Sequence, residues 1–403
     1  MLLLPTLIII SQFVRLGPVN LSWLLYVFLF CNAILNKNRN STSIFLLIIT
    51  VSYPIISSLW SFAPFFYHNL YFSLITGIFV LLYVSSLDVK RGDFFVKGVF
   101  ISCSVFVLLG FFEMMTGHYL IIADNYFTHK LNLNGFHYPV VAFANPNDLG
   151  QYLAILLPLS SVYCFTKIRT KLVRYTIPFL NLLGLYVIFN SESNMSMITF
   201  VFTYAIYLFL SRQSGLNVSQ KIIIVFVILI GMLIVNYKTS LIERIANNVL
   251  FVSTDDVHYT GRAQLYKELL ATALMHPFGG FGNAYTVSFP HNLILYIADD
   301  FGLLIAASFL LLLATIMLKM FKNRYCSDDI VYSILLASLV MFPLSSSISS
   351  GNEQRKVIWI FLGICLHFYS AKRKLDASPG NEFEQKSCGT VFLNNTKEKG
   401  NIS

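Results

Sequence analysis

The stretch SFPHNLILYIADDFGLL places three ionisable side chains at the entrance of an apolar run. His291 stands at its start, and Asp299 and Asp300 follow inside it. An imidazole with an ordinary pKa of about 6.5 can accept a proton at neutral pH. Carboxylates are costly near hydrocarbon and are expected to face the protein interior, a cavity or a cation. The two aspartates are therefore expected either to orient His291 or Arg262, or to mark the membrane boundary.

A helical pattern and a glycine group precede this histidine. From Gly261 to Met275 the spacing predicts an amphipathic helix along the membrane surface, with Leu265, Leu269 and Ala273 on one face. Arg262 and Lys267 are available on its other faces, and Arg262 carries a planar fork suited to phosphate oxygens. The following HPFGGFGNAY allows tight turns and close approach to a ligand, but no Gly-Lys-Ser/Thr makes it a P-loop.

A second polar group lies in GFHYPVVAFANPNDLGQYL. Asn145, Asn147 and Asp148 surround a proline in turn chemistry that leads into a helix, with Asp148 as the expected cap. Two interpretations are open: a capped re-entry into the membrane, or amide side chains that bind a sugar hydroxyl or shape a substrate mouth.

The composition requires a membrane to surround these groups. Of 403 residues, 56% are apolar and 12% charged, and the mean hydropathy is +0.68. Apolar runs recur at about the 20 residues that a helix needs to cross a bilayer, longer than barrel strands. The sequence predicts an all-α transmembrane bundle over residues 1–374 with twelve spans, near 2–14, 19–35, 43–61, 69–87, 94–115, 147–166, 175–190, 195–211, 222–237, 300–318, 330–350 and 357–371.

The basic residues orient these spans. A net charge of +9 could indicate nucleic-acid binding, but most Lys and Arg residues fall in alternate loops, which the positive-inside rule makes cytoplasmic. Both termini are then cytoplasmic, and the two longest loops, 116–146 and 238–299, are outside. The first span is expected to be an uncleaved anchor, and the polar tail 375–403 to be disordered.

The six cysteines show no CxxC spacing, so neither a disulfide framework nor a zinc site is predicted. No other metal site and no cofactor is predicted.

Three motifs in order, FANPNDLGQYL, TGRAQLYKELLATALMHPFGGFGNAY and PHNLILYIADDFGLL, resemble the bacterial O-antigen ligase and O-antigen polymerase superfamily. They cover roughly residues 143–302. The resemblance implies a metal-independent membrane glycosyltransferase in the bacterial inner membrane, with a periplasmic active site. Its donor would be an undecaprenyl-pyrophosphate-linked oligosaccharide. His291 would be the general base toward the acceptor hydroxyl, and Arg262 would hold the donor pyrophosphate. The polar side chains expected to bind substrate are Asn145, Asn147, Asp148 and Asn292.

One departure from the family pattern concerns the pyrophosphate. Relatives carry a Ser-Arg pair at the outer junction of two central spans, where this chain has NSESNMSM without arginine. Either another outer cation, Arg244, Arg355 or Lys356, replaces it, or the donor binds differently.

The resemblance leaves polymerase and ligase open, since both use the same donor and differ in the acceptor. FANPND and the ten residues between His291 and Gly302 favour the polymerase, which adds a chain-length regulator as a candidate partner. A flippase or secondary transporter is the alternative of another class. No two-half repeat is evident, and the polar residues gather in outer loops instead of at the bilayer midplane, which disfavours transport.

Overall fold

The computed structural model describes residues 1–11, 15–16, 19–36, 68–119, 137–211, 262–278, 292–323, 329–346 and 356–376, apart from gaps at 142, 144, 169, 192 and 276, together with the isolated residues 44, 48, 52, 219 and 221. Thirteen helices and one short antiparallel ladder fall within these ranges. The described part of the chain is therefore helical, as predicted.

The helices follow most of the predicted spans. They are α1 (Leu4–Ile10), α2 (Leu21–Leu35), α4 (His68–Ser86), α5 (Val89–Thr116), α6 (Pro146–Lys167), α7 (Lys171–Asn190), α8 (Asn194–Leu210), α11 (Arg262–Met275), α12 (Leu293–Phe301), α13 (Leu303–Asn323), α14 (Asp329–Val340), α15 (Phe342–Ser345) and α16 (Lys356–Asp376). The ladder pairs β1 (Arg15–Leu16) with β2 (Val19–Asn20).

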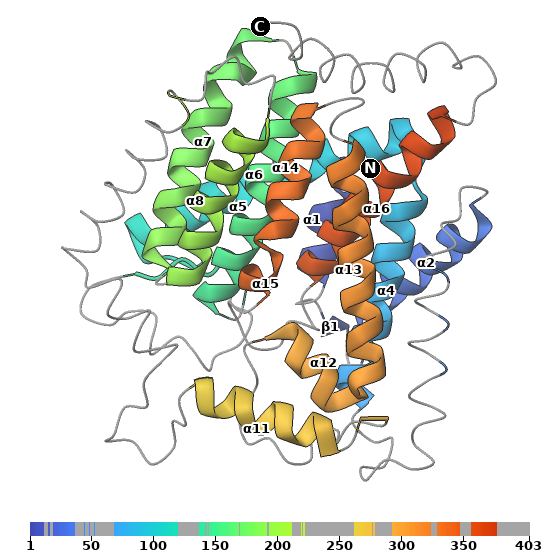
Figure 1. Ribbon diagram of the computed structural model, residues 1–403. Helices are drawn as coiled ribbons and strands as arrows, with labels where there is room; N and C mark the ends of the chain where they lie inside the picture. Colours follow the sequence, from blue (N-terminus) through green and yellow to red (C-terminus); the bar gives the residue numbers. More distant parts are fainter. Residues whose placement is uncertain are drawn as a thin grey trace, which may run out of the picture.

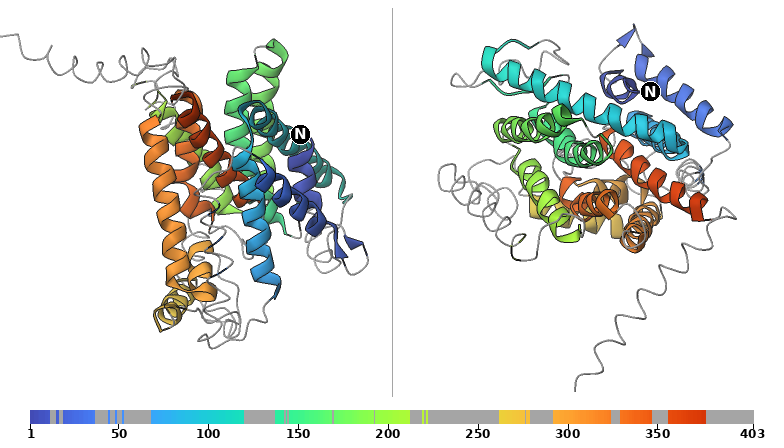
Figure 2. Two further views of the ribbon diagram at one scale, coloured as in Figure 1. Left: turned by 90° about the vertical axis from the view of Figure 1, so that its right-hand side faces the viewer. Right: turned by 90° about the horizontal axis from the view of Figure 1, so that it is seen from above.

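The long helices stand side by side as a bundle (Figure 1). On one side α4 packs between α2 and α16, and on the other α6 packs against α5, α7 and α8. Helix α14 packs against α6 and α8, and α13 packs against α14 and α16. The view from above shows that several helices are tilted across the bundle (Figure 2).

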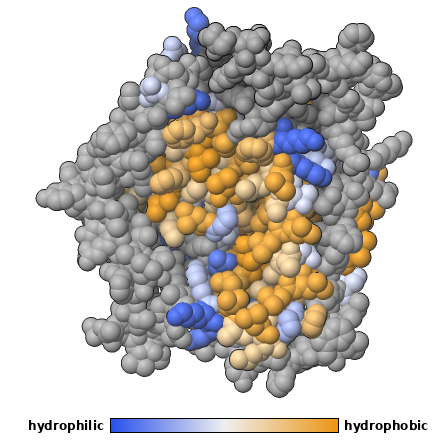
Figure 3. Space-filling model, viewed as in Figure 1, coloured by the Kyte–Doolittle hydropathy of each residue, from blue (hydrophilic) through white to orange (hydrophobic). Residues whose placement is uncertain are grey.

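Within the described ranges, three helices are long and apolar enough to cross a membrane: Val89–Thr116, Pro146–Lys167 and Leu303–Lys322. Six shorter apolar helices accompany them. Large apolar side chains are exposed on several of these helices, and Figure 3 shows a mostly hydrophobic face broken by a few hydrophilic groups. The chain is therefore an integral membrane protein. The count of twelve spans stays a prediction, because 43–61 and 222–237 lie outside the described residues, as does the tail beyond 376.

Three predicted spans differ from the helices observed. The expected span 2–14 contains α1, whose seven residues extend only about 10 Å. The span 300–318 begins instead at Leu303, because Gly302 adopts φ +90° and separates α12 from α13. The span 330–350 breaks at Met341 between α14 and α15.

The predicted amphipathic helix is α11. It lies across the end of the bundle beneath the upright helices (Figure 1). Its buried residues Leu269 and Ala273 share one face, and the helix packs against α12. A hydrogen bond from Leu303 N–H to the carbonyl of Pro277 (2.9 Å) ties the chain after α11 to the start of α13.

Polar and aromatic contacts fix α6 against α5. The Tyr152 hydroxyl donates to the Ser102 hydroxyl (2.9 Å), and both side chains are buried. The rings of Phe106, Phe143 and Tyr152 form one cluster, with centroids 5.2–5.7 Å apart. Because Phe143 lies three residues before α6, these contacts hold the chain that leads into the helix against α5 and α6.

Candidate functional site

The starts of α6 and α12 are joined by the end of α15. The Gln151 side-chain amide donates to the carbonyl of Ser345 (2.7 Å), and Leu293 N–H donates to the carbonyl of Ser346 (3.3 Å). Gln151 belongs to the second turn of α6, and Leu293 is the first residue of α12. The Ser345–Ser346 turn therefore holds the predicted site segment 145–148 and the predicted site residue Asn292 at the same end of the bundle.

The start of α6 is capped by Asn145 and not, as predicted, by Asp148. The Asn145 Oδ1 accepts from Asn147 N–H (2.9 Å), and Pro146 occupies the first helical position. Asp148 lies in the first turn, nearly buried. A carboxylate there interacts favourably with the positive end of the helix dipole. The helix is capped as expected, but the prediction that Asp148 is the cap was wrong, and a role of these residues toward substrate stays a prediction.

Asn292 plays the same part for α12. Its Oδ1 accepts from the N–H groups of Ile294 (3.0 Å) and Leu295 (3.1 Å). His291 directly precedes this cap, and its side chain lies outside the described residues. Asn292 therefore fixes the start of α12 one residue after His291, the predicted general base.

Arg262 is the first residue of α11. Its position is two helical turns before the buried Leu269. Its side chain is outside the description, as are Arg244 and Arg355. Lys356, the third alternative cation, is described: its ammonium donates to the Thr76 hydroxyl (2.8 Å) and lies 5.2 Å from the Tyr26 ring centroid. It is therefore held against α4 and α2.

A serine cluster occupies the junction where the family's Ser-Arg pair is missing. Ser191, Ser193 and Ser196 are buried at the turn from α7 to α8, and the hydroxyl oxygens of the last two lie 2.5 Å apart. Gly150 of α6 packs directly on them, since a Cβ there would come within 2.9 Å of the hydroxyl oxygens of Ser191 and Ser196. The start of α8 thus adjoins the start of α6. The serines are evident in the sequence NSESNMSM, but nothing in that segment predicts that they pack against Gly150.

Sequence reasoning missed Glu113, whose carboxylate organises the end of the first long loop. Glu113 is buried near the end of α5, and its Oε2 accepts from the N–H groups of Val140 (2.9 Å) and Val141 (2.7 Å). Val141 has φ +52°, a backbone conformation that β-branched residues rarely adopt. The carboxylate stabilises this turn just before α6. A single acid in the apolar FFEMMTG was the available signal.

Asp299 lies in α12, outside the candidate spans. The residue is 2% exposed, and its Oδ1 has no hydrogen-bond partner among the described residues. Burial raises the pKa of this carboxyl from 3.8 to about 6. Whether Asp299 orients His291 or Arg262 stays a prediction, because neither of those side chains is described.

Within the described ranges, no three His, Cys, Asp or Glu side chains are grouped so that they could hold a metal ion. What the described residues do bring together is three helix starts, those of α6, α8 and α12. Unsatisfied N–H groups and the positive dipole ends at helix starts favour anions. The arrangement suits a substrate that carries both sugar hydroxyls and phosphate oxygens.

A protein-family model described as O-antigen ligase matches residues 179–310, from within α7 into α13. The matched segment resembles the O-antigen ligase family, which covers O-antigen polymerases and ligases. It contains TGRAQLYKELLATALMHPFGGFGNAY and PHNLILYIADDFGLL, so the family resemblance is confirmed there, whereas FANPNDLGQYL precedes the matched residues. Members of this family are membrane glycosyltransferases that act on lipid-linked glycans. No curated protein matches the chain.

Gln151→Met is expected to destabilise the protein by about 1–3 kcal/mol, because the buried carbonyl of Ser345 loses its donor. Thermal unfolding of the purified protein in detergent measures the effect. Asn190→Leu is the control, since it removes an amide hydrogen bond to the Tyr186 carbonyl at a more exposed position. Equal losses in the two variants would contradict the structural role of Gln151.

Asp299 is expected to make stability depend on pH. Its folded-state pKa of about 6 lies above the ordinary 3.8, so the folded state keeps a proton that the unfolded chain has lost. The free energy of unfolding should fall as the pH rises from about 4 to about 6. Asp299→Asn should remove this dependence. At pH values above about 6, the variant should melt at a higher temperature than the wild type. Melting curves across this pH range test it, with the exposed Glu268→Gln on α11 as control. An unchanged pH profile in Asp299→Asn would refute the assignment.

Proposed function

We propose that this protein is an O-antigen or surface-polysaccharide polymerase. It joins undecaprenyl-pyrophosphate-linked repeat units on the periplasmic side of the bacterial inner membrane, with both termini cytoplasmic. The observation that carries the proposal is the Ser345–Ser346 turn, which holds the start of α6 beside the start of α12. This contact connects the two polar motifs of the family resemblance, FANPNDLGQYL and PHNLILYIADDFGLL.

In the proposed reaction, His291 takes the proton of the acceptor sugar hydroxyl. The hydroxyl oxygen then forms a bond to the anomeric carbon of the donor glycan, and the bond from that carbon to the pyrophosphate oxygen breaks. Undecaprenyl pyrophosphate leaves with the bonding electrons, and Arg262 stabilises its growing charge. A placed base typically contributes about 10²–10⁴-fold, because a neutral sugar hydroxyl is a poor nucleophile.

The start of α8 offers a substitute for the missing arginine of the Ser-Arg pair. The Ser191 hydroxyl donates to the carbonyl of Ile188 (2.7 Å), and the hydroxyls of Ser193 and Ser196 bond each other, so the first N–H groups of α8 are the candidate donors at this position. Hydrogen-bond donors at helix starts can hold phosphate oxygens without a full positive charge. In this scheme Arg262 supplies the cation, and the start of α8 positions the pyrophosphate.

A ligase that transfers the glycan to lipid A-core is the second candidate. The specific observation in its favour is that the matching family model is described as O-antigen ligase. The two activities share the donor and the same site chemistry, so the acceptor decides between them.

A lipopolysaccharide gel separates the candidates. The gene is deleted in its host strain and complemented with the wild-type gene. Core that carries a single repeat in the deletion strain supports the polymerase, whereas bare core with accumulated lipid-linked polymer supports the ligase. An unchanged ladder in the deletion strain would overturn both the polymerase and the ligase. It would favour a transporter, or an enzyme that acts on a glycan other than O antigen.

A further inference from the structure

The end of the first long loop is held by Glu113, a buried carboxylate that the proposed reaction does not use. Glu113 lies in α5, one turn before the helix ends, and is 1% exposed. Its Oε2 accepts from the N–H groups of Val140 (2.9 Å) and Val141 (2.7 Å). An ionisable side chain is costly within a membrane-spanning helix, and its presence there points to a function.

The turn that Glu113 binds has a strained backbone. Val141 has φ +52°, in the left-handed region where the Cβ of a β-branched residue is crowded. The Phe143 N–H donates to the carbonyl of Val140 (2.8 Å), which closes the turn around Val141. Strained backbone persists only where its surroundings fix it, and it concentrates at functional sites. The two charge-assisted hydrogen bonds to Glu113 provide that constraint.

The chain on both sides of this turn packs against α5. Gly110 lies one turn before the carboxylate, and a Cβ there would lie 3.4 Å from the side chains of Pro139 and Leu149. Pro139 precedes the turn, and Leu149 belongs to the start of α6. The ring of Phe143 packs edge-on against an aromatic ring of α5. The chain is therefore fixed to α5 before and after Val141.

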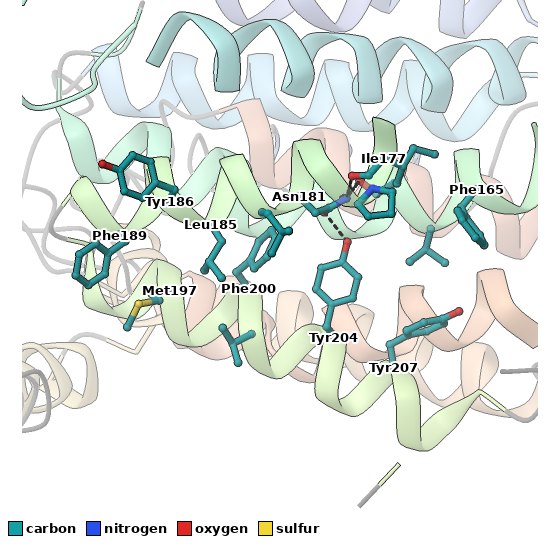
Figure 4. A pocket seen from close by; sticks show the side chains of 15 residues that line it. Phe165, Ile177, Asn181, Leu185, Tyr186, Phe189, Met197, Phe200, Tyr204 and Tyr207 are labelled. Carbon is teal, nitrogen blue, oxygen red and sulfur yellow. Dashed lines mark hydrogen bonds between the residues drawn. The ribbon is translucent and has the colours of Figure 1, made fainter. Parts of the chain in front are cut away.

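Hydrogen bonds to two further helices hold α6 itself. The Ser161 hydroxyl of α6 accepts from the Asn181 Nδ2 of α7 (3.0 Å), and the Asn181 Oδ1 accepts from the Tyr204 hydroxyl of α8 (2.6 Å). The dashed lines in Figure 4 mark hydrogen bonds of this set, beside an apolar pocket between α7 and α8. The turn at Val141 therefore connects two helices that are each held in the bundle, and its conformation decides how the chain enters α6.

We propose that Glu113 is a positioning residue for the glycan substrate: it holds Val141 in its strained conformation and thereby places Asn145 and Asn147 at the substrate mouth. Both asparagines are half-buried at the start of α6. Because the Asn145 Oδ1 caps the helix, the NH₂ group of that side chain is the part that would donate to a sugar hydroxyl. This inference rests on the proposed function for the identity of the substrate. Glu113 acts through the turn and touches no substrate atom.

Amide hydrogen exchange tests the contact without any substrate. The full-length protein in lipid nanodiscs is compared with Glu113→Leu, whose apolar side chain accepts no hydrogen bond. We expect the Val140 and Val141 amides to be protected in the wild type and to exchange about tenfold faster in Glu113→Leu, because both lose their acceptor. Glu113→Gln should keep the protection, since one amide oxygen can accept both N–H groups.

Kinetics with purified lipid-linked repeat units test the positioning role. In Glu113→Leu we expect KM for the repeat unit to rise about tenfold, the factor for the loss of about one hydrogen bond to the sugar. The value of kcat should stay within about twofold, because His291, the proposed base, belongs to another segment. Glu113→Gln should return KM to nearly the wild-type value.

Tyr163→Phe is the matched control. It removes the hydrogen bond from the Tyr163 hydroxyl to the Asp93 carboxylate (2.7 Å), which also joins α6 to α5 but at the opposite end of both helices. It should leave KM unchanged.

A glycine at the strained position separates positioning from stability. Glycine adopts positive φ without strain, so Glu113→Leu combined with Val141→Gly should melt at a higher temperature than Glu113→Leu alone. The relaxed turn is still not held by a carboxylate, so KM should stay raised. If Glu113→Leu does not fold, Glu113→Asp replaces it, because this carboxylate is one methylene shorter and is expected to hold the turn less well.

Four results would overturn the inference. They are unprotected Val140 and Val141 amides in the wild type, an unchanged KM in a Glu113 variant whose turn exchanges faster, recovery of KM together with the melting temperature in the glycine double variant, and an equal rise of KM in Tyr163→Phe. A wild-type protein that makes no polymer would instead contradict the proposed function. The exchange measurement would still show whether Glu113 holds the turn.

Discussion

His291→Ala is expected to lower polymer formation about 10²–10⁴-fold, because the acceptor hydroxyl would lose its general base. The variant protein should still fold, since the start of α12 is capped by Asn292 and tied to Ser346 through backbone atoms. Polymer synthesis from purified lipid-linked repeat units, followed over time, measures the loss. In cells, the gel ladder should collapse to the pattern of the deletion strain.

His118→Ala is the matched control, since His118 is exposed just after α5 and is assigned no role in the site. It should leave the rate unchanged. Undiminished polymer in His291→Ala, with the protein present at wild-type level, would remove the base assignment. Asp299 would then be the next group to test, because it lies in α12, the helix that follows His291, and its Oδ1 has no hydrogen-bond partner among the described residues.

Arg262→Ala is expected to reduce polymer synthesis about 10²–10³-fold, because the charge that develops on the departing pyrophosphate would lose its cation. Arg262→Lys should recover only part of this loss. Lysine keeps the charge, but it lacks the planar fork that binds two phosphate oxygens together. Initial rates and donor affinity, measured separately for both variants, distinguish weaker binding from slower chemistry.

Arg91→Lys is the matched control for this pair, since Arg91 is an exposed residue at the start of α5 that contacts Asp88 at 3.3 Å. It should retain full activity. Near-full activity in Arg262→Lys would argue against a bidentate pyrophosphate clamp. If both Arg262 variants lose activity but still bind the donor, Arg262 acts in the chemical step and not in donor binding.

Local pattern alone determined much of this protein. Long apolar runs predicted helices α4 to α8, and the helical spacing of Leu269 and Ala273 predicted α11. Both signals are local, because a helix repeats about every 3.6 residues along the sequence. The polar segments 145–148 and 291–292 stood out because turn and ionisable residues are rare in so apolar a chain. The family resemblance rested on the same short motifs, and the family match confirmed it.

Only the tertiary structure decided how these segments meet. Gln151 finds its hydrogen-bond partner 194 residues away at Ser345, and Glu113 caps a turn 27 residues beyond it. Gly150 meets the serine cluster because two helix starts pack closely, and Asn145 rather than Asp148 supplies the cap. Such contacts join residues far apart in the chain, and the residue types admit many partners. Packing selects the pairs that leave few buried polar groups unsatisfied, and that selection is made by the whole bundle at once.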